Sequence, residues 1–264
     1  MKLKILVDNN TRIDHYYCGE PGLSFYIEEE DKKILFDTGY SNIFLSNAKL
    51  LNVDLSKINY LVLSHGHNDH TGGLRFLKDK DLSFVNLIAH PGVFESKCHN
   101  GIDISCPVKL EELKVKKYFD GTNIINITDK LVFLGQIERT TSFEKNPVGF
   151  KTATMEPDYL QDDSAMVYKA KDGLFIITAC SHSGICNIIE YAKKVCKQEK
   201  IIGVLGGFHL LKNDEQLLKT VEYLGKQNID NLYPCHCVSL YAKHKMYETC
   251  NVHEVGVGQE FNII

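Results

Sequence analysis

The sequence predicts a layered α+β fold in a single domain, residues 1–264, with a metal site at one edge of its sheets. Two observations lead to this prediction. Apolar stretches of strand length alternate with segments of helical periodicity in both halves of the chain. Histidines follow directly after several of the expected strands, and strands of one layered sheet deliver their ends to a common edge. These histidines are His65, His90, His182, His209 and His236.

In the first half, a helix is expected after Ser41, which can cap it, with apolar positions recurring as far as Leu51. A short helix is expected to open at Thr71, beside two glycines. Strands are expected at residues 4–7, 23–27, 33–36, 60–63 and 84–89.

Residues 95–160 are the least regular part of the chain and mix short strands with loops, so we expect this region to cover the site. Beyond it, a helix carries apolar residues at helical spacing from Ile185 to Ala192. Asn213 and Gln216 are a candidate capping pair for the last clear helix, which Gly225 would stop. The remaining strands are expected at residues 165–168, 174–179, 201–205 and 231–233.

Composition limits the class of partner. The 264 residues are 44% hydrophobic and 24% charged, which is ordinary for a globular protein with one substantial core. A net charge of -4 gives no basic footprint for nucleic acid, and no apolar stretch approaches the roughly 20 residues of a membrane span. We therefore expect a small-molecule substrate, and neither nucleic acid nor a membrane, as the partner.

The N-terminal run enters a strand-like segment directly and lacks the apolar core and cleavage site of a signal peptide. The nine cysteines are an odd number scattered along the chain, and without a signal sequence they favour reduced thiols over disulfides. A cytoplasmic protein is expected.

The most informative motif is HGHNDH at residues 65–70, which directly follows an apolar strand. It places three imidazoles and one carboxylate within six positions. One tetrahedral ion would not normally take four ligands from so short a segment, so the spacing indicates two adjacent metal ions.

Residues 65–70 resemble the signature of the metallo-β-lactamase superfamily, and ILFDTG at residues 34–39 is similar to the strand and turn that precede it there. Further blocks resemble a narrower subgroup, related to the archaeal 7,8-dihydropterin-6-methyl-4-(β-D-ribofuranosyl)aminobenzene 5′-phosphate synthase. These blocks are GLS at 22–24, DD at 162–163, TACSHSG at 178–184, GGFHL at 206–210 and PCHC at 234–237. The resemblance implies an αββα sandwich of the metallo-β-lactamase type, with metals at one edge of the sheets.

The resemblance also implies a ligand set. His65 and His67 would bind one metal and Asp69 and His70 the second, with His182 and His236 as further ligands. Cys180 stands where many relatives carry a bridging aspartate, so it is either a thiolate ligand or a small buried apolar residue. A third motif of the Gly-His-Thr type is not visible between residue 70 and the strand at 165.

Imidazoles and carboxylates suit zinc, iron, manganese or nickel. Diiron relatives usually carry glutamate at the position of His67, so two zinc ions are the leading expectation. The same residue argues against a diiron oxidoreductase.

Other polar residues are candidates for binding or orientation. His209 is a candidate catalytic residue beside Asp69, and His90 a candidate substrate contact; a structural role stays open for both histidines. Arg139 could grip a phosphate or carboxylate of the substrate, or pair with a neighbouring glutamate. Asp37, and one of Asp162 and Asp163, are expected to orient the site. The cysteines flanking His236, Cys235 and Cys237, are expected to pack.

The leading hypothesis is a metal-dependent hydrolase, in which a metal-bound water attacks an ester, lactone or phosphoester of a small molecule. Asp69 would both bind metal and position the nucleophile. A transferase that joins a pterin pyrophosphate to an aminobenzene ribosyl phosphate is the closer alternative. A diiron oxidoreductase and a non-catalytic metal-binding sensor are the others.

Overall fold

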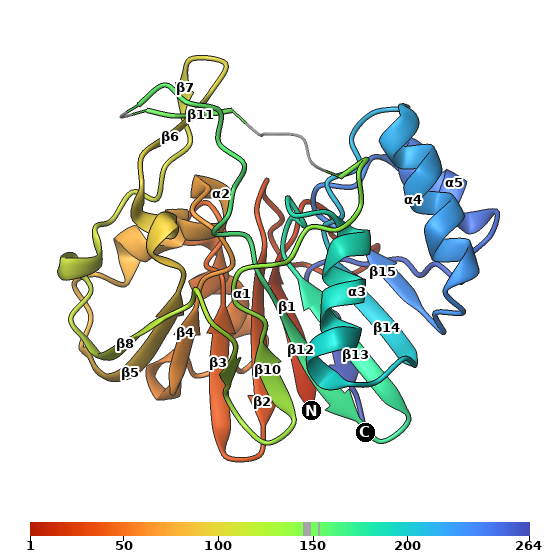
Figure 1. The fold of residues 1–264 in the computed structure, drawn as a ribbon. Helices are drawn as coiled ribbons and strands as arrows, with labels where there is room; N and C mark the ends of the chain where they lie inside the picture. The colour runs from red at the N-terminus through yellow and green to blue at the C-terminus, as the bar shows by residue number, and fades with distance from the viewer. Residues whose placement is uncertain (145–148, 153) are drawn as a thin grey trace.

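The computed structural model describes residues 1–144, 149–152 and 154–264. Two sheets pack face to face, with helices on their outer faces, so the chain forms the expected αββα sandwich (Figure 1). The first sheet has seven strands in the order β16 (Glu260–Asn262), β1 (Lys2–Val7), β2 (Ser24–Glu29), β3 (Lys32–Phe36), β4 (Tyr60–Val62), β5 (Leu82–Ala89) and β8 (Val115–Asp120). The second has six, in the order β15 (Leu232–Pro234), β14 (Ile201–Gly206), β13 (Gly173–Thr178), β12 (Ala165–Ala170), β10 (Leu131–Phe133) and β9 (Ile125–Asn126).

The α-helices are α1 (Ile43–Leu50), α2 (Asn68–Thr71), α3 (Ile185–Cys196), α4 (Glu215–Lys226) and α5 (Leu240–Tyr247). Short 3₁₀ turns lie at η1 (Leu55–Lys57), η2 (Gly72–Phe76), η3 (Pro91–Phe94) and η4 (Leu110–Glu112). In the part of the chain that the structure describes, no helix combines the length and the apolar character needed to cross a bilayer.

The central core lies between the two sheets. Phe25 and Phe36 from the first sheet meet Phe133 and Ile177 from the second, and all four side chains are fully buried. Alternate residues of β1 point to this core and to the layer under α1, as the period-two pattern of a strand buried on both faces requires. Burial of these aromatic side chains is the main force that holds the two sheets together.

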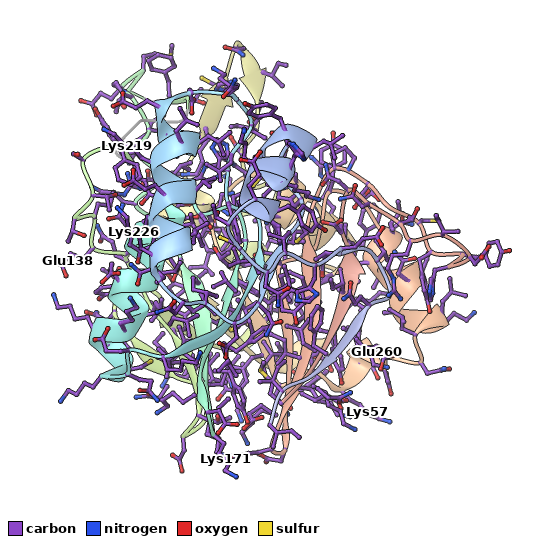
Figure 2. All side chains as sticks on the ribbon, turned by 90° about the vertical axis from the view of Figure 1, so that its right-hand side faces the viewer. Lys57, Glu138, Lys171, Lys219, Lys226 and Glu260 are labelled. Atoms are coloured by element: carbon purple, nitrogen blue, oxygen red, sulfur yellow. The ribbon has the colours of Figure 1, made fainter. Side chains whose placement is uncertain are left out.

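Helices α3, α4 and α5 cover the outer face of the second sheet, on the right of Figure 1. Helix α4 buries Leu217 and Leu224 and turns its charged residues outward. Figure 2 shows two of these, Lys219 and Lys226, pointing away from the body of the protein. They form (i, i+4) ion pairs with Glu215 and Glu222, of the kind that gives an exposed helix face a few tenths of a kcal/mol.

Two details of the helices differ from expectation. Asp214, rather than Asn213, caps α4, because its carboxylate accepts a hydrogen bond from the Leu217 N–H at 3.0 Å. The helix also continues past Gly225 to Lys226. The short helix expected to open at Thr71 is the 3₁₀ helix η2, whose N-cap is Thr71, and α2 precedes it from Asn68.

The irregular region 95–160 contributes to three sheets. Strands β8, β9 and β10 extend the two main sheets, while a small third sheet has the order β11 (Phe150–Lys151), β6 (Lys97–His99), β7 (Ile102–Asp103). Figure 1 shows this small sheet above α2, at the end of the molecule opposite the two chain termini. Residues 145–148 and 153 of the region lie outside the described residues. A single domain spanning the whole chain stays a prediction.

The strand directions bring polar side chains to one edge. Strands β3 and β4 are parallel to each other, and so are β13, β14 and β15. Strand β1 runs in the same direction as β3, since both are antiparallel to β2. The residues that follow these strands therefore gather at the sheet edge beneath the small third sheet (Figure 1).

Candidate metal centre

The first group of possible ligands consists of His65, His67 and His182, whose ligand atoms lie within 4.8 Å of one another. The rings of His65 and His182 are 4.7 Å apart between centroids, as are those of His65 and His67. Among the described residues, the Nε2 atoms of His65 and His67 and both ring nitrogens of His182 are buried without a hydrogen-bond partner. Buried polar atoms are normally paired, so a cation at this place fits the unpaired nitrogens.

The second group consists of Asp69, His70, Cys180 and His236. The Nε2 atom of His70 lies 3.2 Å from Cys180 Sγ and 3.1 Å from His236 Nε2, and His236 Nε2 lies 3.3 Å from Asp69 Oδ2. Nitrogen ligands of a tetrahedral zinc ion are separated by roughly 3.3 Å, given Zn–N distances near 2.0–2.1 Å. The donor set and its spacing therefore fit a second cation.

The two groups are adjacent, because the rings of His65 and His70 are 4.3 Å apart between centroids. The structure thus brings together all seven residues that the sequence offered as ligands, in two sets. Their roles as ligands stay a prediction.

Hydrogen bonds hold the ligand rings from behind. Asp37, at the end of β3, accepts from His70 Nδ1 at 2.7 Å and from the backbone N–H of Ser64 at 2.8 Å. The Ser64 hydroxyl lies 2.9 Å from His65 Nδ1. These contacts occupy the Nδ1 atoms and leave the Nε2 atoms to point inward, which is how proteins orient metal-binding histidines.

The sequence analysis missed the residues that hold His236. Asn9 Oδ1 lies 2.8 Å from His236 Nδ1, and Asp8 Oδ1 accepts from the backbone N–H of His236 at 2.7 Å. Both follow β1 directly. The sequence signal that identifies them is their position as polar residues immediately after an apolar strand.

Both members of the Asp162-Asp163 pair orient the site, where one was expected to do so. Asp162 accepts a hydrogen bond from the backbone N–H of Gly66 at 2.8 Å, and Asp163 accepts from that of Ser183 at 2.8 Å. Each carboxylate thus fixes the backbone next to a histidine of the first group. Burial raises the pKa of Asp163 to about 6.

Burial also sets the protonation of the histidines. Loss of hydration lowers the pKa of His65 and His182 well below the ordinary range and lowers that of His67 to about 4. The first group is therefore neutral at pH 7, as metal ligation requires. Burial acts in the same direction on His70, but the carboxylates of Asp69 and Asp37 outweigh it and raise its pKa.

Both groups open onto one pocket of about 760 Å³. His209 lies in its wall, with its ring 4.4 Å from that of His182 between centroids, and burial lowers its pKa to about 4. The small third sheet contributes His99, and the loop after β7 contributes Ile104. The remaining lining residues outside the two groups are Asn9, Pro21, Tyr40, Asn68, Leu211, Lys212 and Cys237.

Two candidate substrate contacts lie elsewhere. His90 follows β5, one strand farther out than β4, and its Nδ1 accepts from the Gly92 N–H at 3.0 Å to cap the turn η3. Arg139 donates to the backbone carbonyls of Tyr159 and Leu160 and lines a separate hollow. The structure places both residues outside the pocket lining, because strand order and local hydrogen bonds direct them away.

The cysteines that flank His236 behave differently from each other. Cys235 packs in the core between the sheets, as expected. Cys237 was also expected to pack, but it lines the pocket, where its Sγ accepts from the His209 N–H at 3.3 Å. Alternation along an extended segment places the two on opposite faces, and one of these faces is the site.

Comparison with known proteins agrees with this geometry. The profile of the metallo-beta-lactamase superfamily matches residues 19–81. An uncharacterized protein of Methanocaldococcus jannaschii is 34% identical over 94% of this chain and 95% of its own length. The 7,8-dihydropterin-6-methyl-4-(beta-D-ribofuranosyl)-aminobenzene-5′-phosphate synthase of the same organism is 29% identical over 94% of this chain and 91% of its own length.

A solved structure of Tm1679, described as a metal-dependent hydrolase of the beta-lactamase superfamily, superposes with a TM-score of 0.85 at 26% identity, over 100% of this chain and 99% of that one. The Zn²⁺-bound PqqB of Methylobacterium extorquens, at 11% identity and a TM-score of 0.59 over 100% of both chains, supports the fold alone. The matches in sequence, the fold and the grouping of the candidate ligand residues all point to the same family. This chain belongs to the metallo-β-lactamase superfamily.

Proposed function

We propose that the protein is a metal-dependent hydrolase that cleaves an ester, lactone or phosphoester of a small molecule, with two zinc ions as its cofactors. The observation that carries this proposal is the placement of two adjacent ligand groups on one pocket. His67 and His182 of the first group and Asp69, Cys180 and His236 of the second all line that pocket. A substrate in the pocket would therefore contact both groups at once.

Metal ions held by these two groups would supply Lewis acidity, which polarises a carbonyl or phosphoryl oxygen and lowers the pKa of water. The protein side chains define the remaining chemistry. Burial raises the pKa of Asp69, but the charges of His70 and His236 outweigh this effect and lower it, so the carboxylate is ionised at neutral pH. Its side chain is 29% exposed and lines the pocket, where it can hold a water molecule for attack.

His209 lies in the pocket wall, and its ring is 4.4 Å from that of His182 between centroids. With its pKa lowered to about 4, its ring is neutral at pH 7 and offers one N–H donor and one acceptor nitrogen. It can thus donate a hydrogen bond to a substrate oxygen without adding a charge beside the metal ligands.

A second candidate function is transfer, the joining of a pterin pyrophosphate to an aminobenzene ribosyl phosphate. The synthase that is 29% identical over 94% of this chain favours it. The pocket volume of about 760 Å³ also lies in the upper part of the range for small-molecule sites, roughly 300–1,000 Å³, and leaves room for two substrates.

The test uses metal-free protein reloaded with zinc, assayed against chromogenic phosphomonoesters, phosphodiesters, carboxylic esters and lactones. We expect turnover of at least one class, lost with a chelator and restored by zinc. Asp69→Asn should lower kcat by at least about 100-fold, in the range for a residue that positions a nucleophile. The matched control Asp172→Asn, in the exposed turn between β12 and β13, should leave kcat unchanged.

Each other outcome selects an alternative. Absence of hydrolysis together with a joined product from dihydropterin pyrophosphate and aminobenzene ribosyl phosphate, detected by mass spectrometry, would favour the transferase. Iron rather than zinc in the purified protein would favour oxidoreduction. Metal binding with no turnover in any assay would contradict both catalytic proposals and favour a sensor.

A further inference from the structure

A buried lysine connects the small third sheet to the ligand motif. Lys97 begins β6, and its side chain is 2% exposed. Its Nζ lies 3.3 Å from Asp158 Oδ2 and 3.4 Å from Asp162 Oδ1, and both carboxylates are equally buried. A charge this deep in the protein must be paired, and these two aspartates pair it.

The lysine reaches the ligand motif at Gly66, the residue between His65 and His67. The second oxygen of Asp162 accepts the Gly66 N–H at 2.8 Å. A Cβ atom built on Gly66 would lie 2.4 Å from the Val93 carbonyl oxygen, which excludes any side chain here, and 2.7 Å from Lys97 Cε. Gly66 therefore bonds to the carboxylate of Asp162 and lies beside both the alkyl stem of Lys97 and the Val93 carbonyl.

The segment from Lys97 to Ile104 also contacts the backbone on the other side of His67, at Asn68. The Ile104 N–H donates to the Lys97 carbonyl at 3.1 Å, and the Asn68 N–H donates to the Ile104 carbonyl at 2.9 Å. His99, two positions after Lys97 in the sequence, lines the pocket, and so does Ile104. The same short segment thus forms part of the pocket wall and fixes the backbone on both sides of a candidate ligand.

Stability alone does not account for such a group. Burying an ammonium and two carboxylates has a desolvation cost that their attraction barely offsets, and apolar residues of similar volume often stabilise a protein equally well. A buried ion network does fix one arrangement of its members, since each hydrogen bond is directional. Here the fixed arrangement includes the backbone between two histidines of the first ligand group.

We propose that Lys97 is a positioning residue for the first metal site: it holds Asp162 against the Gly66 N–H and so sets the geometry and the metal affinity of His65, His67 and His182. It also ties the pocket wall formed by His99 and Ile104 to that site. The inference rests on the metal binding assumed in the proposed function and adds a determinant outside the ligand groups.

The test is Lys97→Met, which keeps an unbranched side chain as far as Cε and removes the charged ammonium. Cobalt(II) is the probe, because the second group contains a thiol and the first contains only nitrogen ligands, so the two sites differ in their absorption. We expect affinity at the all-nitrogen site to fall by about 10- to 100-fold, as for other residues that orient metal ligands. The cobalt affinity of the second site, followed by its sulfur–cobalt absorption band, should stay at the wild-type value.

The matched control is Lys151→Met, which removes a lysine from β11 of the same small sheet. Its ammonium pairs with Glu95 at 2.7 Å on the surface and makes no contact with the Asp162 carboxylate among those that the structure describes. It should bind both cobalt ions as the wild type does. If Lys97→Met does not fold, Lys97→Met with Asp158→Asn removes one charge of each sign and is compared instead.

A second readout needs no metal. In the metal-free protein, the Gly66 amide should exchange its hydrogen at least about tenfold faster in the Lys97 variant, measured by NMR, because Asp162 no longer holds its acceptor position. Unchanged Gly66 exchange and unchanged cobalt affinity would overturn the inference while leaving the hydrolase proposal intact. A wild type that binds no cobalt would overturn the hydrolase proposal, and the exchange measurement would still decide the link between Lys97 and Gly66.

Discussion

Asp37 and His70 form a buried pair in which the Asp37 carboxylate accepts from Nδ1 of the imidazole at 2.7 Å. This contact fixes the ring so that Nε2 lies 3.2 Å from Cys180 Sγ and 3.1 Å from His236 Nε2. The end of one strand in the first sheet thereby orients a side chain toward ligands supplied by the second sheet. The candidate metal centre is thus a product of how the two sheets are packed, and it depends on residues behind the candidate ligands.

Asp37→Asn should weaken the second metal site. The amide lacks the negative charge that favours the Nδ1–H tautomer of His70, and loss of such partners typically costs 10- to 100-fold in metal affinity. Zinc affinity measured by competition with a chromogenic chelator checks this prediction. Asp31→Asn, in the exposed turn before β3, is the control, and equal affinities for the two variants would contradict it.

Cys180→Ser should remove sulfur from the second site. Cys180 lies 3.2 Å from His70 Nε2 and its thiol is buried, so a metal ion there would bind it as a thiolate. We expect the cobalt-loaded wild type to show a sulfur-to-cobalt band in the near ultraviolet that the variant lacks. Cys196→Ser, at the end of α3 and away from the pocket, should keep the band. A band that survives in Cys180→Ser would make Cys180 a packing residue.

The metal-free protein should lose stability as the pH falls from 7 to 5. The pKa of His67 is about 4 in the folded protein and about 6.5 in an unfolded chain, so unfolding binds a proton in this window. The contribution of neutral His67 to stability is therefore complete above pH 6.5 and decreases as the pH falls toward 4. His67→Gln should remove about 2 kcal/mol of this loss, measured by urea unfolding at both pH values. An identical pH dependence in the variant would show that His67 binds its proton equally well in the folded and the unfolded protein and would contradict the prediction.

Glu144→Ala should destabilise the helix that follows His182. Glu144 is buried, and its carboxylate accepts from the backbone N–H groups of Cys186 at 3.1 Å and Asn187 at 3.0 Å. It takes the place of a side-chain cap, since the N-cap of α3 is Gly184. Loss of two charge-assisted hydrogen bonds should lower the free energy of unfolding by about 2–4 kcal/mol. Glu138→Ala, exposed on the same segment, should change it by less than about 0.5 kcal/mol.

The sequence predicted the fold and the gathering of the ligand residues well, for a physical reason. Buried strands are apolar, so a histidine directly after one of them lies at a sheet edge, and His65, His182, His209 and His236 all meet there. The motif spacing also predicted the two groups into which the structure places these side chains, and their roles as ligands stay a prediction.

Prediction from the sequence was less accurate where the place of a strand within the sheet decides whether a residue reaches the pocket. His90 follows a strand as His65 does, but β5 lies one strand farther from the second sheet's ligands, and only the strand order reveals this. Contacts between residues far apart in sequence were equally hidden. The bond between Asn9 and His236 spans 227 positions, and that between Gly66 and Asp162 spans 96.

The most direct test of the account is the metal content per chain of protein purified without added metal, for the wild type, His182→Ala and the control His244→Ala. His182 has both ring nitrogens buried and unpaired among the described residues, whereas the His244 side chain is 70% exposed on α5. We predict two zinc ions in the wild type and the control, and one in His182→Ala. A single ion in all three proteins would contradict the two-metal site and remove His182 from it.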